Sequence, residues 1–176
     1  MKIMDDIKAK AAWLYEGTST RKVVRACLSD GTTCMVLYRS MAWLNTVPPL
    51  KPVAMVLSKL NSMINGAVIG AGASFGERCV ILHSEGIVIN TRVRGGTDIV
   101  FESGVVIGEE KRKCPVLGNN IFVGAGAKII GGVTIGDNVT IGANAVVVKD
   151  VPANCSVGGV PARIIRQRPP PGEPVS

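Results

Sequence analysis

The sequence predicts a parallel β-helix preceded by a group of α-helices, and three observations support this fold class. An apolar residue recurs every six positions from residue 67 onward, a period that fits neither an α-helix nor a long alternating strand. The 176 residues include 21 glycines and only 4% aromatic residues, which suits small packing positions beside tight turns. Residues 1–64 lack this period and show helical spacing. We therefore expect a mainly β protein with an N-terminal helical region (1–64), a β-helix (65–160) and a C-terminal segment (161–176).

The N-terminal region is expected to contain four helices. The segment MDDIKAKAAWLYEG has apolar residues at helical spacing and ends at Gly17. The segment STRKVVRACLSDG begins with a residue suited to cap a helix and ends at Asp30 and Gly31. Two further helices, TTCMVLYRSMAWLN and PPLKPVAMVLSKLNSMIN, flank a break at Pro48 and Pro49.

The last of these helices has an apolar stripe formed by Leu50, Val53, Leu57 and Leu60. A basic amphipathic helix can lie on a membrane surface, but a short one is more often packed against its own domain or another subunit, and we expect packing here. No stretch approaches the roughly 18 apolar residues of a membrane span. The start, MKIMDD, lacks the pattern of a signal peptide, so a cytoplasmic location is expected.

The six-residue period defines the expected strands of the β-helix. Each unit is expected to form one short strand with its central aliphatic side chain inward and to turn at the glycine, asparagine or aspartate that follows, so that three units close one coil. The register is open between residues 93 and 108, because VVIG (105–108) also fits a phase shifted by two. The central residues are Ile69, Phe75, Ile81, Ile87, Val93, Ile99 and Val105 and, after a break at Lys111, Leu117, Val123, Ile129, Ile135, Ile141 and Val147.

Two further groups of residues complete this prediction. Small side chains two positions before the aliphatic residue fit the interior near a tight corner. They are Ala67, Ala73, Cys79, Ala127 and Ala145. The C-terminal end from Arg168 is polar and rich in proline, and it is expected to be disordered.

The bulk composition argues against several function classes. The net charge of +7 would suit nucleic acid, an anionic membrane or a phosphorylated small molecule, but the basic clusters have few aromatic neighbours to stack bases, so nucleic acid is not expected. The five cysteines lie far apart without a CxxC motif, which indicates neither a disulfide framework nor a zinc ribbon. A single histidine cannot provide the ligands of a metal-dependent hydratase, so no metal is expected.

Several motifs together resemble a serine acetyltransferase-type protein over roughly residues 36–166. They are LYRSMAWL, LSKLNSMING, HSEGIVIN, VGAGAKIIGGVTIGDNVTIGANAVVVKDVP and GGVPARII. The resemblance implies a left-handed β-helix; general crossover rules would favour the right-handed form. It also implies a homotrimer with active sites in clefts between neighbouring β-helices, and in some members paired trimers.

The only histidine of the chain, His83, stands at the family's HxxGIV position. The resemblance implies that it is the general base that accepts the proton of an acceptor hydroxyl. An imidazole suits this role because it can accept and return a proton near neutral pH. Without the motif, a lone histidine among aliphatic residues is more often a satisfied packing residue.

The chain departs from the serine-specific members at three positions. The resemblance places an aspartate directly before the histidine, an acidic residue fifteen positions upstream and a second histidine in an Arg-His-Pro segment; here these are Leu82, Val68 and Cys114. Without those carboxylates the imidazole loses its orienting partner and an α-ammonium group has no evident site. We therefore expect a neutral hydroxyl of a sugar or another small metabolite as the acceptor, and we name Glu85 and Glu102 as candidate substitute carboxylates.

Acetyl-CoA is the acetyl donor that the resemblance implies. Its pantetheine would lie along the turns at Ala125 and Ala143, Gly108 would lie near the thiol, and phosphate-side positions would be Lys149, Arg163 and Arg166. The glycines of GAGAKIIG belong to the periodic array and match no nucleotide-binding loop.

Three alternatives accompany this interpretation. Cys114, beside Arg112 and Lys113, could act as a nucleophile in a covalent relay. The acceptor could be L-serine, which would require another acidic group. The β-helix could also be a non-catalytic binding or assembly module.

Overall fold

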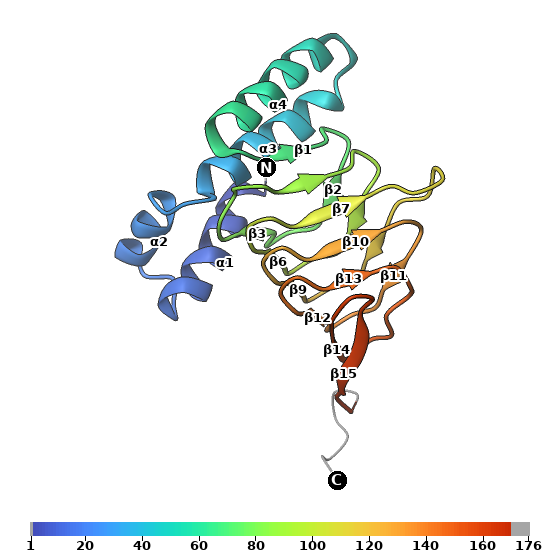
Figure 1. Cartoon of the computed structure of the whole chain (residues 1–176). Helices are drawn as coiled ribbons and strands as arrows, with labels where there is room; N and C mark the ends of the chain where they lie inside the picture. The colour runs from blue at the N-terminus through green and yellow to red at the C-terminus, as the bar shows by residue number, and fades with distance from the viewer. Residues whose placement is uncertain (1, 170–176) are drawn as a thin grey trace.

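The computed structural model describes residues 2–169, which form four α-helices followed by a parallel β-helix (Figure 1). This arrangement confirms the predicted fold class. No helix in the described part of the chain is long and apolar enough to cross a membrane. The helices are α1 (Ile3–Tyr15), α2 (Thr20–Cys27), α3 (Thr32–Asn45) and α4 (Lys51–Asn65), with a short 3₁₀ turn at Pro48–Leu50.

Three parallel sheets form the walls of the β-helix, and the chain visits them in turn. The first sheet contains β1 (Val68–Ile69), β4 (Val88–Ile89), β7 (Val106–Gly108), β10 (Lys128–Ile130) and β13 (Val146–Val147). The second contains β2 (Ser74–Phe75), β5 (Arg94–Gly95), β8 (Val116–Leu117) and β11 (Thr134–Ile135). The third contains β3 (Val80–Ile81), β6 (Ile99–Phe101), β9 (Ile121–Val123), β12 (Thr140–Ile141), β14 (Cys155–Gly158) and the antiparallel β15 (Arg163–Gln167).

The core of the β-helix is a column of aliphatic side chains. The small residues expected two positions before the strand centres (Ala67, Ala73, Cys79, Ala127 and Ala145) are all buried, as predicted. These residues lie beside tight corners, where a larger side chain would meet the opposite wall.

The predicted phase of the repeat is wrong at Ile87, and the register left open between residues 93 and 108 follows the phase shifted by two. Ile69 pairs with Ile89 and Ile81 pairs with Phe101, so each pair is separated by two residues more than three hexapeptides. The physical reason is an enlarged corner after β3, which displaces the phase by two as far as β7; the longer loop between β7 and β8 restores the predicted phase at Leu117. The predicted centres Ile87, Val93, Ile99 and Val105 are buried, but they occupy the corner-adjacent positions; Ile89, Gly95, Phe101 and Ile107 occupy the strand centres.

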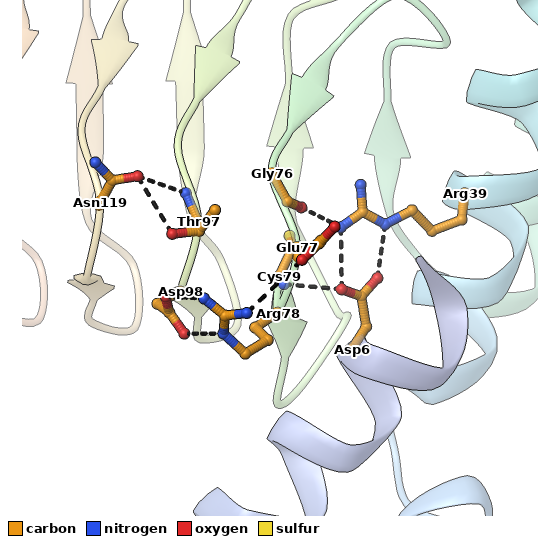
Figure 2. A network of polar contacts seen from close by, with 9 residues as sticks. All are labelled: Asp6, Arg39, Gly76, Glu77, Arg78, Cys79, Thr97, Asp98 and Asn119. Atoms are coloured by element: carbon orange, nitrogen blue, oxygen red, sulfur yellow. Dashed lines mark hydrogen bonds and ion pairs between the residues drawn. The ribbon is translucent and has the colours of Figure 1, made fainter. Parts of the chain in front are cut away.

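A buried ion pair anchors the helices to the β-helix (Figure 2). Arg39 on α3 donates to both carboxylate oxygens of Asp6 on α1, at 2.6 and 3.0 Å, and also to the carbonyl oxygen of Gly76 at 2.6 Å. The backbone N–H of Cys79 donates to Asp6 at 3.0 Å. Two helices and the first coil therefore meet at one polar cluster, which holds α1 and α3 against the end of the solenoid.

The predicted stripe of Leu50, Val53, Leu57 and Leu60 does not pack as a unit on its own domain, because Leu57 packs against the core whereas Val53 and Leu60 are exposed in the protomer. Packing of this face against another subunit stays a prediction. The expected disordered tail falls mostly on residues 170–176, which lie outside the described residues. Before them, β15 pairs with β14.

Candidate functional site

His83 lies on the enlarged corner between β3 and β4, here called the His83 corner (residues 82–86). Ile81 pairs with Phe101, and Gly86 stacks on Gly104 in the next coil. The first coil has four residues between these two points (82–85), whereas the next coil has only two (102–103). The two additional residues push the chain outward, because the core below the corner is already filled. His83 is consequently exposed, while Leu82 beside it is buried.

Asp30 supplies a carboxylate to this histidine. Its Oδ2 lies 3.0 Å from Nδ1 of His83, and Ser84 Oγ donates to its Oδ1 at 3.4 Å. Sequence reasoning expected the imidazole to lack an orienting partner and named Glu85 or Glu102 as substitutes. That expectation is wrong, because the imidazole has a carboxylate partner, and this partner is Asp30 from the loop between α2 and α3. A carboxylate on Nδ1 leaves Nε2 free to accept a proton, which is the geometry of a positioned general base.

Gly31 allows this loop to approach the β-helix closely. Its φ of +75° is in the left-handed region, and a Cβ at this position would lie 2.4 Å from the carbonyl oxygen of Ile81. Only glycine fits this contact without moving one of the two backbones. The backbone N–H of Gly31 also donates to Asp30 Oδ1 at 2.7 Å, so one glycine both seats the loop and orients the carboxylate.

Lys10 on α1 supports the loop from behind. Its side chain is 0% exposed, and its ammonium donates to the backbone carbonyl oxygen of Asp30. Burial lowers the pKa of Lys10 from 10.5 to about 8, and the nearby charge of Asp30 opposes that shift. The loop that carries Asp30 is therefore fixed by α1 as well as by its contact with the coil.

The electrostatics favour an ionised Asp30. Partial burial acts to raise the pKa of Asp30, but hydrogen bonds from His83 and Gly31 and the positive charges of His83 and Lys10 outweigh it and hold the pKa below its usual value of 3.8. At neutral pH the histidine consequently faces a negatively charged partner, which stabilises an imidazolium ion formed during proton transfer.

A cleft of about 350 Å³ opens beside this pair. Two carboxylates, Asp30 and Glu85, contribute to its walls, and the C-terminal end of α4 closes one side. Its lining consists of Asp30, Met63, Ile64, Asn65, Gly66, Ser84 and Glu85. A small acceptor held here could meet both the base and negative charge.

Below the His83 corner, the corners of the successive coils stack into one edge, here called the His83 edge. The stacked positions are Glu85, Ser103, Ala125 and Ala143, linked by backbone hydrogen bonds of 2.8 Å between adjacent coils. The structure therefore brings the candidate base and the two candidate pantetheine-side alanines to the same edge of the solenoid. Their small side chains leave its backbone groups accessible. Glu102 precedes Ser103 on this edge and is half-buried.

The other predicted residues lie elsewhere in the protomer. Gly108 ends β7, Cys114 follows in the excursion (residues 109–114) between β7 and β8, and Lys149 follows β13. These three lie on the next edge of the solenoid, with the first sheet between them and His83. Arg163 and Arg166 are exposed on β15.

Cys114 lies among groups of both charges. Its Sγ lies 3.4 Å from Oδ1 of Asn90 and 3.9 Å from a carboxylate oxygen of Glu109. The guanidinium of Arg92 also interacts with this thiol. The role of Cys114 as a nucleophile therefore stays a prediction. In the described residues no group of three or more histidine, cysteine, aspartate or glutamate side chains could hold a metal ion.

Asp30 is the residue that sequence reasoning missed. It was interpreted only as the end of a helix, because aspartate followed by glycine is common where helices stop. One signal could have pointed to Asp30. It lies in the helical region that directly precedes the first coil, and His83 belongs to that coil.

Comparison with known proteins identifies the relatives of this chain. Residues 114–149 match the family model described as bacterial transferase hexapeptide (six repeats). The serine acetyltransferase of Synechococcus elongatus is 37% identical over 139 residues, which cover 77% of this chain and 57% of that protein. The serine acetyltransferase of Helicobacter pylori strain J99 is 39% identical over 117 residues, 64% of this chain and 68% of that protein. The chain thus spans little more than half the length of some relatives.

Solved structures give the same result. A Brucella abortus serine acetyltransferase in complex with coenzyme A has a TM-score of 0.82 at 27% identity, with coverage of 93% of this chain and 67% of that one. A Neisseria gonorrhoeae serine acetyltransferase in complex with serine has a TM-score of 0.81 at 26% identity, covering 93% and 68%. The similarity includes most of the helical region and not only the hexapeptide repeats.

Proposed function

The chain belongs to the serine acetyltransferase-like family of hexapeptide-repeat acyltransferases, and from this premise we propose that it is an acetyl-CoA-dependent O-acetyltransferase with His83 as the general base. The observation that carries the proposal is the contact of 3.0 Å between His83 and Asp30 at the head of the edge that contains Ala125 and Ala143. A non-catalytic β-helix would not need a carboxylate and an imidazole in this arrangement.

The proposed reaction is a direct transfer. Nε2 of His83 takes the proton of the acceptor hydroxyl while the hydroxyl oxygen attacks the thioester carbonyl carbon. The carbon–sulfur bond then breaks, and the imidazolium returns the proton to the departing coenzyme A thiolate. Asp30 holds the ring so that Nε2 faces the acceptor, and its charge stabilises the imidazolium between the two proton transfers.

L-Serine is the acceptor that we propose to test first. The missing carboxylates at Leu82 and Val68 argued against serine, but the cleft contains Asp30 and Glu85, and either carboxylate can attract an α-ammonium group. The relatives described above are serine acetyltransferases, which also favours serine over a sugar. A neutral hydroxyl remains the second candidate, because Asp30 is already engaged with the base.

For acetyl-CoA, we propose that pantetheine lies along the His83 edge at Ala125 and Ala143. The exposed basic residues Lys149, Arg163 and Arg166 would meet the phosphates. Gly108 and the excursion of the same protomer lie one sheet away from His83. We therefore propose a homotrimer in which one β-helix presents its His83 edge and a neighbour presents the edge with Gly108 and Cys114.

The proposal is tested by measuring thiol release from acetyl-CoA with L-serine, amino sugars, neutral sugars and small alcohols. We expect turnover with L-serine, and a loss of at least about 10²-fold in His83→Ala. Turnover only with a neutral hydroxyl would assign the acceptor to the second class. Absence of turnover together with absence of coenzyme A binding in calorimetry would overturn the proposal and favour a non-catalytic module.

A further inference from the structure

The cleft beside the candidate base is lined by hydrogen-bond acceptors. It contains the carboxylates of Asp30 and Glu85 and the side-chain amide of Asn65, and none of its lining residues is a lysine or an arginine. Nδ2 of Asn65 donates to Oδ1 of Asn61 at 2.9 Å, and among the described residues no hydrogen bond reaches Oδ1 of Asn65. Ser84 Oγ donates to Asp30, so its proton is also engaged. A ligand in this cleft therefore needs to supply hydrogen-bond donors.

The C-terminal end of α4 adds to the negative potential of the cleft. The aligned peptide dipoles of a helix place a partial negative charge at this end, and the last turn of α4 contains no basic residue to offset it. Glu85 lies close to this end, since a Cβ at Gly66, the residue that ends the helix, would lie 3.9 Å from Oε1 of Glu85. Two carboxylates and a helix C-terminus thus border the same space, which favours a cation over a neutral molecule.

Of the two carboxylates, Glu85 is the one available to a ligand. Asp30 is engaged through both oxygens, because Oδ2 lies 3.0 Å from Nδ1 of His83 and Oδ1 accepts from the backbone N–H of Gly31 at 2.7 Å. The ammonium of Lys10 also donates to the backbone carbonyl oxygen of Asp30, and its charge offsets part of the Asp30 charge. None of the ion pairs formed by the described residues includes Glu85, and its side chain is exposed.

Given the proposed acetyl transfer, on which this inference rests, we propose that Glu85 selects acceptors that carry a protonated amine beside the hydroxyl group. An ammonium group has three donors and no acceptor, so it matches the lining of the cleft and takes the carboxylate of Glu85 as its counter-ion. A carboxylate on the acceptor meets neither a lysine nor an arginine in this cleft. The amine is therefore sufficient for recognition. L-Serine is one member of a wider class of acceptors that includes amino alcohols without an acid group.

The test compares two acceptors with the same skeleton, 2-amino-1,3-propanediol and glycerol, which differ only in an ammonium group that replaces the central hydroxyl. With acetyl-CoA as donor, we expect the wild type to prefer the amine by at least about tenfold in kcat/KM and to use it with an efficiency comparable to that for L-serine. Glu85→Gln should remove this preference through a higher KM for the amine, with little change in kcat, because the residue binds the acceptor and takes no part in proton transfer. Glu77→Gln, at an exposed carboxylate between β2 and β3, is the matched control and should keep the preference.

A binding measurement separates failure of this inference from failure of the proposed function. Calorimetric titration of 2-amino-1,3-propanediol in the presence of coenzyme A measures recognition of the amine without acetyl transfer. Binding that weakens by at least about tenfold in Glu85→Gln would support the role of Glu85 even where no acceptor is acetylated, an outcome that overturns the proposed function alone.

Three results would overturn the inference while acetyl transfer stands. The first is equal use of glycerol and the amine by the wild type. The second is absence of amine binding by the wild type, or equal binding by the wild type and Glu85→Gln. The third is a kcat/KM for L-serine more than about a hundredfold above that for the amine, which would show that the acid group of the acceptor is recognised as well.

Discussion

Nδ1 of His83 and Oδ2 of Asp30 lie 3.0 Å apart although 53 positions separate them in the chain. One side chain comes from an enlarged corner of the β-helix and the other from a loop between two helices. The helical region therefore contributes directly to the candidate site, and the site depends on how α1, α3 and the first coil pack together.

The first prediction concerns Asp30. Asp30→Asn should lower kcat/KM by about 10²-fold, because the amide can donate to Nδ1 and hold the imidazole in the wrong tautomer. The loss should fall on kcat more than on KM, since the carboxylate acts through the imidazole in the proton transfer. Steady-state rates measure both parameters. Asp5→Asn, at an exposed position on α1, is the control, and an unchanged kcat in Asp30→Asn would refute the positioning role.

The second prediction concerns Gly31. Gly31→Ala should reduce activity by at least about tenfold and stability by about 1–3 kcal/mol, because the new Cβ meets the Ile81 carbonyl oxygen and the left-handed φ is strained. Gly159→Ala is a matched control, since its φ is +89° but its nearest contact is 3.8 Å away. Urea unfolding of both variants separates the cost of the contact between the new Cβ and the Ile81 carbonyl oxygen from the cost of placing alanine at a positive φ. Equal losses in the two variants would mean that the close approach at Gly31 is unimportant.

The third prediction concerns the pH dependence of stability through Lys10. Burial lowers the pKa of Lys10 from 10.5 to about 8, so between these values the unfolded chain binds a proton that the folded chain has released. Stability therefore rises with pH in this window. The free energy of unfolding of the wild type, taken relative to Lys10→Met, should increase by about 3 kcal/mol from pH 8 to pH 10.5. A flat difference in urea titrations across that range would contradict the burial of this ammonium.

The fourth prediction compares two arginine–aspartate pairs. Arg39→Met should destabilise the protein by about 3–5 kcal/mol, because it leaves the Asp6 carboxylate buried without its partner. Arg78→Met removes an equally close but solvent-exposed contact with Asp98 and should cost far less stability than Arg39→Met, because water screens the exposed pair. Denaturant unfolding measures both. Similar losses would show that the cluster of Asp6 and Arg39 does not anchor the helices.

The fifth prediction tests the proposed cofactor edge. Ala143→Leu should raise the Kd for coenzyme A by at least about tenfold in calorimetry, because the larger side chain blocks approach to the backbone on the His83 edge. Thr134→Leu, at an exposed position on the second sheet, should bind normally. If the two variants bind coenzyme A alike, the pantetheine lies elsewhere.

Much of this molecule is predictable from local sequence. The six-residue period specifies short strands and regular corners, because a turn every six residues leaves the chain few other compact solutions. Helical spacing in residues 1–64 predicts the four helices. The HxxGIV motif predicts His83 as the candidate base from its immediate neighbours. Each of these features depends on residues close together in the chain.

The tertiary structure decided the rest. The phase error after Ile81 arose because a two-residue insertion and a regular repeat place equally apolar residues at Ile87 and Ile89, and only strand pairing distinguishes them. The partner of His83 was found only where Gly31 lets a distant loop touch the coil. The exposed stripe on α4 likewise depends on which face packs inward. The periodicity of the sequence determines local conformation. Contacts between residues far apart in the chain depend on how the helices and coils pack against one another, and no local sequence pattern specifies that packing.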